Sequence, residues 1–366
     1  MRKREWRCLA GPRLSGLPGA DSAGSPARNV RTPGSERAGL PARTYTCRFL
    51  RVSRGIGATA WALVAVGIAA PALRRRVDVP PAAVLGSAVL APVALCVAVP
   101  RSRARDLTLC TLNMWAYMAA YEMPNDDPAR LAARARLDYP LALDRALGLG
   151  APPTIRLQRA FASPDAVRPL EGVLVWCHWI WFLVPHASVA YVLLRDRARF
   201  PAAAARMYAV FDLGAVFYWA IPTAPPWWAS AHGCAEDGHE IEIRRMMIEY
   251  GEQFWGERWP ALYDLLGGNP LAAMPSLHFA TSLMAAHLLF EVGTVAGLLA
   301  SAYTAVLGVA LVYLGEHYAV DLFAGAVLTE AVRAQAPRAA PLIRRVSRAL
   351  QALRARSLPA SRTAFA

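Results

Sequence analysis

The chain has 366 residues, of which 55% are hydrophobic and 18% are charged, and this balance excludes an ordinary soluble domain of that length. The formal net charge of +14 would suggest a nucleic-acid partner in a soluble protein. Here the basic residues fall mainly in the tails and in short connections between apolar runs. That distribution is typical of a membrane protein whose basic segments set its orientation and contact anionic lipid, so no nucleic-acid partner is expected.

The cysteines indicate neither a zinc site nor a disulfide scaffold, because they form no CxxC pair and no framework spacing. They are Cys8, Cys47, Cys96, Cys110, Cys177 and Cys234.

The chain begins with a basic segment rich in Pro, Gly and Ser, which is predicted to be disordered over residues 1–54. A cleavable signal peptide is not expected, because the first apolar run starts only near residue 56.

Eight apolar runs are long enough to cross about 30 Å of hydrocarbon as helices. They cover residues 56–73, 79–100, 106–122, 172–194, 203–223, 276–292, 295–314 and 317–335. The runs lack the alternating pattern of a barrel, and an open sheet would leave backbone groups unsatisfied in lipid. The predicted fold is all-α, a polytopic integral membrane bundle of about eight transmembrane helices.

These runs divide the chain into further predicted parts. N-terminal transmembrane helices occupy 55–122, an outer segment of short amphipathic helices occupies 123–170, and a membrane domain occupies 171–335. The bundle is expected to have a core of about five or six helices. A basic cytoplasmic tail follows at 336–366, and its Arg residues alternate with Leu, Ile and Val in a way that suits a helix lying on the inner leaflet.

Arginine clusters predict the orientation. Four segments are rich in arginine: the leader, residues 101–105, residues 195–206 and the tail beyond Arg333. Eight spans put all four segments on the same side of the membrane. We therefore expect both termini in the cytoplasm. Arg74 to Arg76 are the exception, because this topology puts them outside with the acidic segment 224–275.

A first motif, Ala273-Met-Pro-Ser-Leu-His-Phe-Ala280, lies at the predicted outer end of a span. Ser276 is a plausible N-cap, and the free amides of a first helical turn favour a bound anion such as phosphate. His278 lies in that turn and could donate a proton to a leaving oxygen.

A second motif, Tyr313-Leu-Gly-Glu-His-Tyr-Ala-Val-Asp321, places His317 and Asp321 four residues apart and thus on one helical face. A carboxylate that binds one ring nitrogen fixes the tautomer and raises the nucleophilicity of the other nitrogen. The pattern therefore predicts attack by His317 on phosphorus and a double displacement.

Together these motifs resemble the type 2 phosphatidic-acid phosphatase superfamily, over roughly residues 170–335. The forms Pro-Ser-Leu-His and Gly-Glu-His-Tyr-Ala-Val-Asp are most similar to its inositol phosphorylceramide synthase-like, inositolphosphotransferase branch of actinobacterial type. Two further segments strengthen that resemblance, Ile221-Pro-Thr-Ala-Pro-Pro-Trp-Trp228 and Asn269-Pro-Leu-Ala-Ala273.

The resemblance implies an enzyme in which His317 is the nucleophile, Asp321 its orienting partner and His278 the general acid, with no metal or organic cofactor. The substrate would be a lipid phosphate at the outer face of the plasma membrane, and water or a lipid alcohol would accept the phosphoryl group. Transferase and hydrolase remain open alternatives, including hydrolysis of a polyprenyl phosphate.

The chain departs from the superfamily in its phosphate clamp. The superfamily usually supplies an upstream Lys and Arg and a later Ser-Arg pair, but Lys3 is the only lysine, and Ala310 and Leu311 occupy the later positions. Arginine must therefore supply the cation. Arg244 and Arg245, with Ser276, are the predicted phosphate-binding residues, followed by Arg156 and Arg159.

Three other interpretations stand beside this one. His278, His317 and Asp321 could share a zinc ion, although nothing else in the chain supports a metal. The chain could be a non-catalytic transporter or scaffold in which His178, His186 and His287 form a proton path. We expect instead that each of these three span histidines packs in the bundle with a hydrogen-bonded partner.

Overall fold

The computed structural model describes residues 42–163, 166–232, 235–236, 239–240, 243–266 and 268–357. The chain divides into Met1–Thr46 and Cys47–Ala366, and every described residue beyond Thr46 belongs to the second unit. The predicted disordered leader lies largely outside the described residues, but α1 begins at Ala42, before the predicted boundary at residue 55.

The described chain is helical apart from one antiparallel pair of two-residue strands, β1 (Ala235–Glu236) and β2 (His239–Glu240). The long helices are α1 (Ala42–Leu73), α2 (Pro81–Ala98), α3 (Arg103–Glu122), α7 (Pro169–Ile180), α8 (Val184–Arg195), α9 (Phe200–Ala220), α13 (Leu277–Phe290), α14 (Thr294–Tyr313) and α15 (Ala319–Ser357). The short ones are η1 (Met123–Asp126), α4 (Pro128–Ala132), α5 (Asp138–Leu147), α6 (Pro153–Phe161), α10 (Pro226–Ala231), α11 (Met246–Trp255), η2 (Gly256–Arg258) and α12 (Trp259–Leu266).

Among the described helices, four are long and apolar enough to cross a membrane, at Gly55–Leu73, Pro81–Ala98, Phe200–Ala220 and Thr294–Tyr313. The pair α7 and α8 makes a fifth if its 54° bend lies within one span. The all-helical multi-pass membrane fold is thus confirmed, whereas the count of eight is not reached. The 14-residue α13 is about 21 Å long and too short to cross the hydrocarbon alone.

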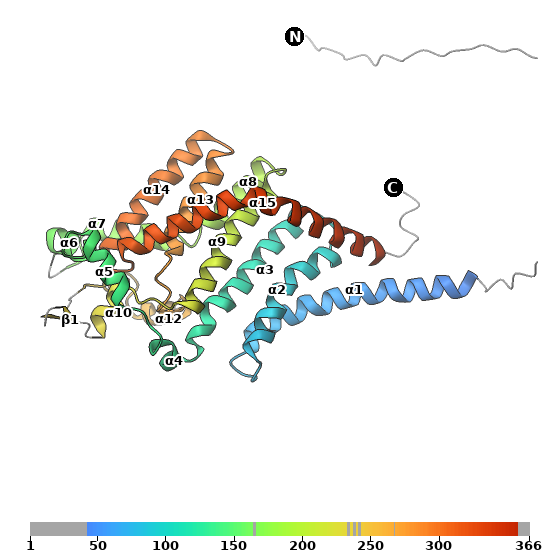
Figure 1. Ribbon diagram of the computed structural model, residues 1–366, viewed down its shortest axis with the longest axis horizontal. Coiled ribbons are helices and arrows are strands. Elements are labelled where there is room, and N and C mark those ends of the chain that lie inside the picture. The colour runs from blue at the N-terminus through green and yellow to red at the C-terminus, as the bar shows by residue number, and fades with distance from the viewer. Residues whose placement is uncertain are drawn as a thin grey trace, which may run out of the picture. The chain divides into compact units, whose positions relative to one another are not determined.

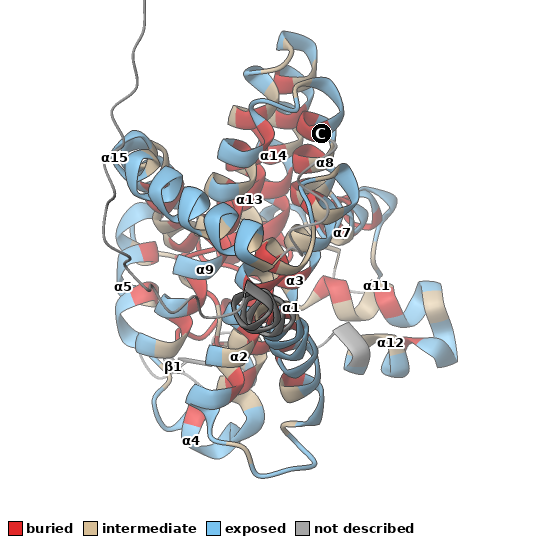
Figure 2. Ribbon diagram, turned by 90° about the vertical axis from the view of Figure 1, so that its right-hand side faces the viewer, coloured by how far each residue is buried: buried red, intermediate tan, exposed pale blue. Residues whose placement is uncertain are grey.

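Helix α13 lies at the centre of the bundle and packs against α8, α9, α14 and α15. Its buried side chains belong to the largest apolar cluster, which includes Phe211 and Tyr218 of α9 and Leu307 and Leu311 of α14. Figure 2 shows this concentration of buried residues along α13 and α14. The central helix is thereby held on several sides, and it is the helix whose first turn carries His278.

The N-terminal helices form a second cluster, in which α2 packs on α3 and on the later part of α15. Leu350 of α15 contacts this cluster, and Arg354 donates a hydrogen bond to the Val97 carbonyl at 3.4 Å. The predicted boundary between bundle and tail at residue 335 therefore falls inside one helix, since α15 continues to Ser357.

The short helices α4, α5, α6, α10 and α12 gather at one end of the bundle (Figure 1). Backbone bonds join three loops there: Arg136 N donates to the Pro222 carbonyl at 2.8 Å, and Thr223 N donates to the Leu271 carbonyl at 2.9 Å. Ala273 N returns a bond to the Thr223 carbonyl at 3.1 Å. This backbone network braces the segment that leads into α13.

Candidate active site

The N-terminus of α13 is capped by Ser276, as its position after Pro275 predicts. The Ser276 hydroxyl accepts a hydrogen bond from Phe279 N at 3.4 Å, and Tyr218 donates to the Pro275 carbonyl at 2.9 Å. The Met274–Pro275 peptide is cis. Ser276 is fully buried and does not line the cavity described below, so its hydroxyl serves the helix start that carries His278.

The turn between α14 and α15 positions His317. Both Glu316 N and His317 N donate to the Leu311 carbonyl, at 3.1 and 3.0 Å, which closes the end of α14. Gly315 has a φ of 82°, and a Cβ there would lie 2.8 Å from Ile243 Cγ2, so both the backbone and the neighbouring side chain require glycine.

Hydrogen bonds from the start of α13 and from α5 hold the start of α15. Tyr318 N donates to Asp321 Oδ2 at 2.9 Å, and Ser276 N donates to the Asp321 carbonyl at 2.9 Å, which joins the two motifs directly. From α5, Asp144 Oδ1 accepts a hydrogen bond from Val320 N at 3.0 Å. A distant carboxylate therefore caps the helix that carries Asp321.

The two predicted motifs meet. His278 Nδ1 lies 3.1 Å from His317 Nε2, and His317 Nδ1 lies 3.4 Å from Asp321 Oδ2. A carboxylate can only accept, so His317 carries its proton on Nδ1 and its Nε2 lone pair faces His278. The buried Asp321 thus holds His317 in the tautomer that a nucleophilic imidazole requires.

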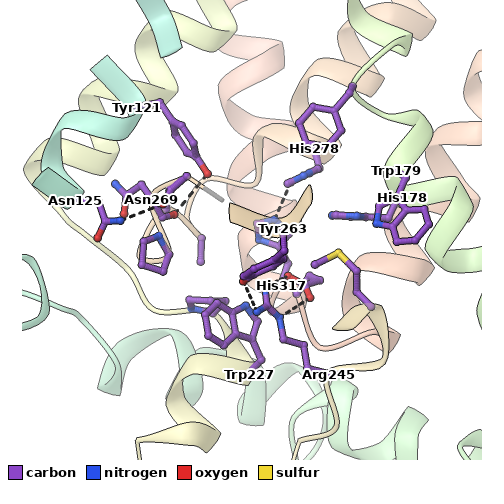
Figure 3. A pocket seen from close by; sticks show the side chains of 18 of the residues that line it. Tyr121, Asn125, His178, Trp179, Trp227, Arg245, Tyr263, Asn269, His278 and His317 are labelled. Carbon is purple, nitrogen blue, oxygen red and sulfur yellow. Dashed lines mark hydrogen bonds and ion pairs between the residues drawn. The ribbon is translucent and has the colours of Figure 1, made fainter. Parts of the chain in front are cut away.

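His278 and His317 open into a cavity of about 420 Å³ (Figure 3). Aromatic rings make much of its wall, from Tyr121, Trp179, Phe182, Trp227, Trp259 and Tyr263. Asn125 and Asn269 lie on the left of that view, across from His178 and Trp179, and Asp264 and Glu316 also line the cavity. His278 and His317 therefore face a partly open cavity whose wall includes six aromatic side chains.

Arg245 is the arginine that lines this cavity within the described part of the chain. It forms an ion pair with Glu316 at 3.0 Å, donates to the Tyr263 hydroxyl at 2.7 Å and lies 3.7 Å above the centre of the Trp227 ring. Although burial opposes the charge, Glu316 and Tyr263 raise the pKa of Arg245. It is a fixed cation at the cavity wall.

The neighbouring Arg244 points elsewhere. Its guanidinium pairs with Glu249 and donates to the Ser163 carbonyl, while its backbone N donates to Gln158 Oε1 at 3.0 Å. Arg156 donates to the Leu149 carbonyl at 3.2 Å, and neither Arg156 nor Arg159 lines the cavity. Of the predicted phosphate-binding arginines, only Arg245 shares a cavity with His278 and His317.

The sequence assigned three residues near the site no part in catalysis. His178 stacks on His278 with ring centres 4.7 Å apart, and Asn269 is 4% exposed with an unpaired side-chain nitrogen. Asp144 caps α15 from the segment predicted to form short amphipathic helices on the outer side. The sequence feature that could have pointed to His178 is that it is an ionisable residue inside a predicted span. No spacing links it to either motif.

Among the described residues, no three His, Cys, Asp or Glu side chains are arranged to hold a metal ion.

A model of the PAP2 superfamily matches residues 141–334. Searches of curated proteins and of solved structures found no match. The matched segment is more than half of the chain and contains His278, His317 and Asp321 together with the cavity residues from His178 onward. The chain therefore belongs to the PAP2 superfamily, whose members are membrane phosphatases and phosphotransferases.

Proposed function

We propose that this protein transfers a phosphorylated head group between membrane lipids through a covalent intermediate on His317. The observation that carries the proposal is the position of His317 Nε2. One side of that ring is fixed by Asp321, and the other faces His278 at the wall of the cavity. Superfamily membership supports the coarser statement, a lipid phosphatase or phosphotransferase.

In the first step, the Nε2 lone pair of His317 forms a bond to phosphorus and the bond from phosphorus to the leaving oxygen breaks. That oxygen takes a proton from His278, which starts this step as the imidazolium cation and ends it as the neutral imidazole. In the second step, the acceptor hydroxyl gives its proton to His278 and its oxygen bonds phosphorus as the N–P bond breaks. Protons and charge balance over the two steps, so the cycle needs no cofactor, and we propose that it is metal-independent.

The 3.1 Å between the two histidine nitrogens leaves no room for a phosphorus atom between them. A substrate must enter from the cavity and replace that hydrogen bond with contacts from both rings to the phosphate. Arg245 faces the same cavity and can stabilise the equatorial oxygens. We assign phosphate binding to Arg245 in preference to Arg244, and to Ser276 a role in positioning the helix.

The finer assignment is an inositolphosphotransferase acting at the outer face of the plasma membrane, with both termini in the cytoplasm and a lipid alcohol as acceptor. It rests on the form of the two motifs and on the arginine pattern. Hydrolysis of a lipid phosphate or polyprenyl phosphate is the second candidate, because water can reach the same phosphorus. A transporter or scaffold of the same architecture would carry the motifs without turnover.

The test incubates purified wild-type, His317→Ala and His232→Ala protein with labelled lipid phosphates and phosphoinositides, with and without diacylglycerol or ceramide. His232 is an exposed histidine outside the cavity and serves as the matched control. We expect turnover by the wild type and the control and a loss of about a thousandfold or more in His317→Ala. An unchanged rate in His317→Ala contradicts the catalytic assignment.

Product masses separate the candidates. A new lipid that carries the head group, formed only when acceptor is present, marks a transferase. Free phosphate without an acceptor marks a phosphatase.

A further inference from the structure

Helix α7 brings a third histidine to the site. The His178 ring stacks on the His278 ring at 4.7 Å between centres and 29° between planes, and both rings line the cavity. His178 is 6% exposed. Figure 3 shows it beside His278, on the same wall of the cavity.

The ring nitrogens of His178 are not needed for its stacking on His278. Its Nδ1 is enclosed and has no hydrogen-bond partner among the described residues. Buried polar groups are normally paired, and a phenylalanine would make the same stack without the cost of an unpaired nitrogen. An imidazole at this position is therefore expected to bind something that is absent from the protein itself.

The tautomer indicates what it binds. A neutral imidazole carries one proton, and a proton on Nδ1 would be an enclosed donor without an acceptor. The proton is therefore better placed on Nε2. The ring then offers one N–H donor to the cavity, and the chemistry that accepts it is an anionic oxygen.

The cavity offers little positive charge for a phosphate. Arg245 is the arginine that lines it among the described residues, and Arg245 already binds Glu316 and Tyr263. During its transfer a phosphoryl group carries negative charge on three equatorial oxygens. The guanidinium of Arg245, which already binds two side chains, cannot donate to all three.

We propose that His178 is a phosphate-binding residue of the active site, which donates a hydrogen bond from its imidazole to a non-bridging phosphate oxygen next to His278. The inference rests on the proposed function and deepens it. It assigns to a span histidine part of the phosphate binding that Arg245 alone cannot supply.

Two substitutions separate this role from packing. His178→Phe keeps a flat ring against His278 and removes the donor, whereas His178→Gln keeps a donor and removes the ring. His186→Phe is the matched control, because His186 also stacks on an aromatic ring, Phe211 at 5.8 Å, but does not line the cavity. Each variant is compared with the wild type for monodispersity and thermal unfolding in detergent.

The readouts are the turnover of the lipid substrate and inhibition by orthovanadate, which mimics the phosphoryl group in flight. We expect His178→Phe to lose roughly tenfold to a hundredfold in both kcat and vanadate affinity, the effect of one hydrogen bond to a charged group. His178→Gln should recover part of both, and His186→Phe should match the wild type.

A folded His178→Phe protein with wild-type kcat and vanadate inhibition overturns the inference while leaving the role of His317 intact. The converse result is also distinguishable. If His317→Ala keeps full turnover, the proposed function fails, whatever the His178 variants do.

Discussion

His317 differs from the other histidines whose side chains are described in having a polar partner at each ring nitrogen, His278 at one and Asp321 at the other. The four-residue spacing is enough to predict the Asp321 contact, because it follows from helix geometry. The contact with His278 is not predictable from spacing. It depends on how α13 packs against the turn that precedes α15, and the bond from Ser276 N to the Asp321 carbonyl fixes that packing.

Asp144 is the buried carboxylate that supports this turn from α5. Burial raises the pKa of Asp144 to about 6, above its ordinary value of 3.8, even though the amide of Val320 donates to it. The folded protein therefore favours the protonated acid. Its contribution to stability is fully present below pH 3.8 and is lost as the pH rises through about 6.

Asp144→Asn should remove that pH dependence, because an amide keeps the acceptor oxygen for Val320 N and cannot ionise. We expect the unfolding temperature of the wild type in detergent to fall between about pH 4 and pH 7 more steeply than that of Asp144→Asn. The exposed Glu252→Gln serves as the control. Parallel curves for wild type and Asp144→Asn would show that this carboxyl does not carry the effect.

Among the helices, the crossing of α13 and α15 aligns the two motifs. Gly325 of α15 faces α13, and a Cβ at that position would lie 2.6 Å from the Ser276 carbonyl oxygen and 3.4 Å from Ala280 Cβ. Thr329 one turn later donates to the Ala280 carbonyl at 2.8 Å. The close approach of the helices thus depends on a residue without a side chain.

Gly325→Ala is expected to destabilise the protein by about 1–3 kcal/mol, because the added methyl group forces the helices apart. Activity should fall as well, since the same contact sets the distance between His278 and His317. Gly86→Ala in α2 is the matched control, because a Cβ at that position would meet nothing within 4 Å and alanine should stabilise that helix by up to about 1 kcal/mol. Equal effects of the two substitutions on unfolding would contradict the packing argument.

Apolar runs predict where helices lie better than where they break. Residues 172–194 are predicted to form one span, yet α7 ends at Ile180 and α8 begins at Val184 with a 54° bend. Pro185 explains the break, because proline has no N–H to donate and its ring clashes with the carbonyl four residues earlier. The run at 276–292 yields a helix of 14 residues, since Ser276 caps its start.

For the orientation of the chain in the membrane, the segment that violates the arginine rule contains two arginines that form ion pairs. Arg74 and Arg75, predicted on the outer side, each bind Asp126 at 2.9 Å, and Arg74 also binds Glu122 at 2.9 Å. That both termini lie in the cytoplasm stays a prediction, which rests on the arginine clusters.

The orientation is testable with single cysteines on a background in which the native cysteines are replaced by serine. Arg130→Cys lies on the exposed α4, at the end of the bundle that holds the site, and Arg345→Cys lies on the exposed part of α15. We expect a membrane-impermeant maleimide to label Arg130→Cys in intact cells and Arg345→Cys only after permeabilisation. The reverse pattern would put the site in the cytoplasm.

The sequence predicts the residues that we propose as catalytic but not the cavity around them. His278, His317 and Asp321 lie in two short motifs, whereas the cavity wall is assembled from α3, α7, α10 to α12 and the loops between them. Spacing could not separate Arg245 from Arg244, because adjacent side chains in an irregular segment point in directions that only packing decides. The same holds for His178, which lies far from His278 in the sequence.

The proposed mechanism requires a covalent intermediate on His317, and trapping that intermediate tests it. Purified wild-type protein is mixed with a lipid substrate labelled at phosphorus, quenched in alkali and digested, and the labelled peptide is identified by mass. We predict an acid-labile, alkali-stable label on the peptide that contains His317, present in His232→Ala and absent from His317→Ala. A label on another residue, or undiminished product formation by His317→Ala, would contradict nucleophilic catalysis by His317.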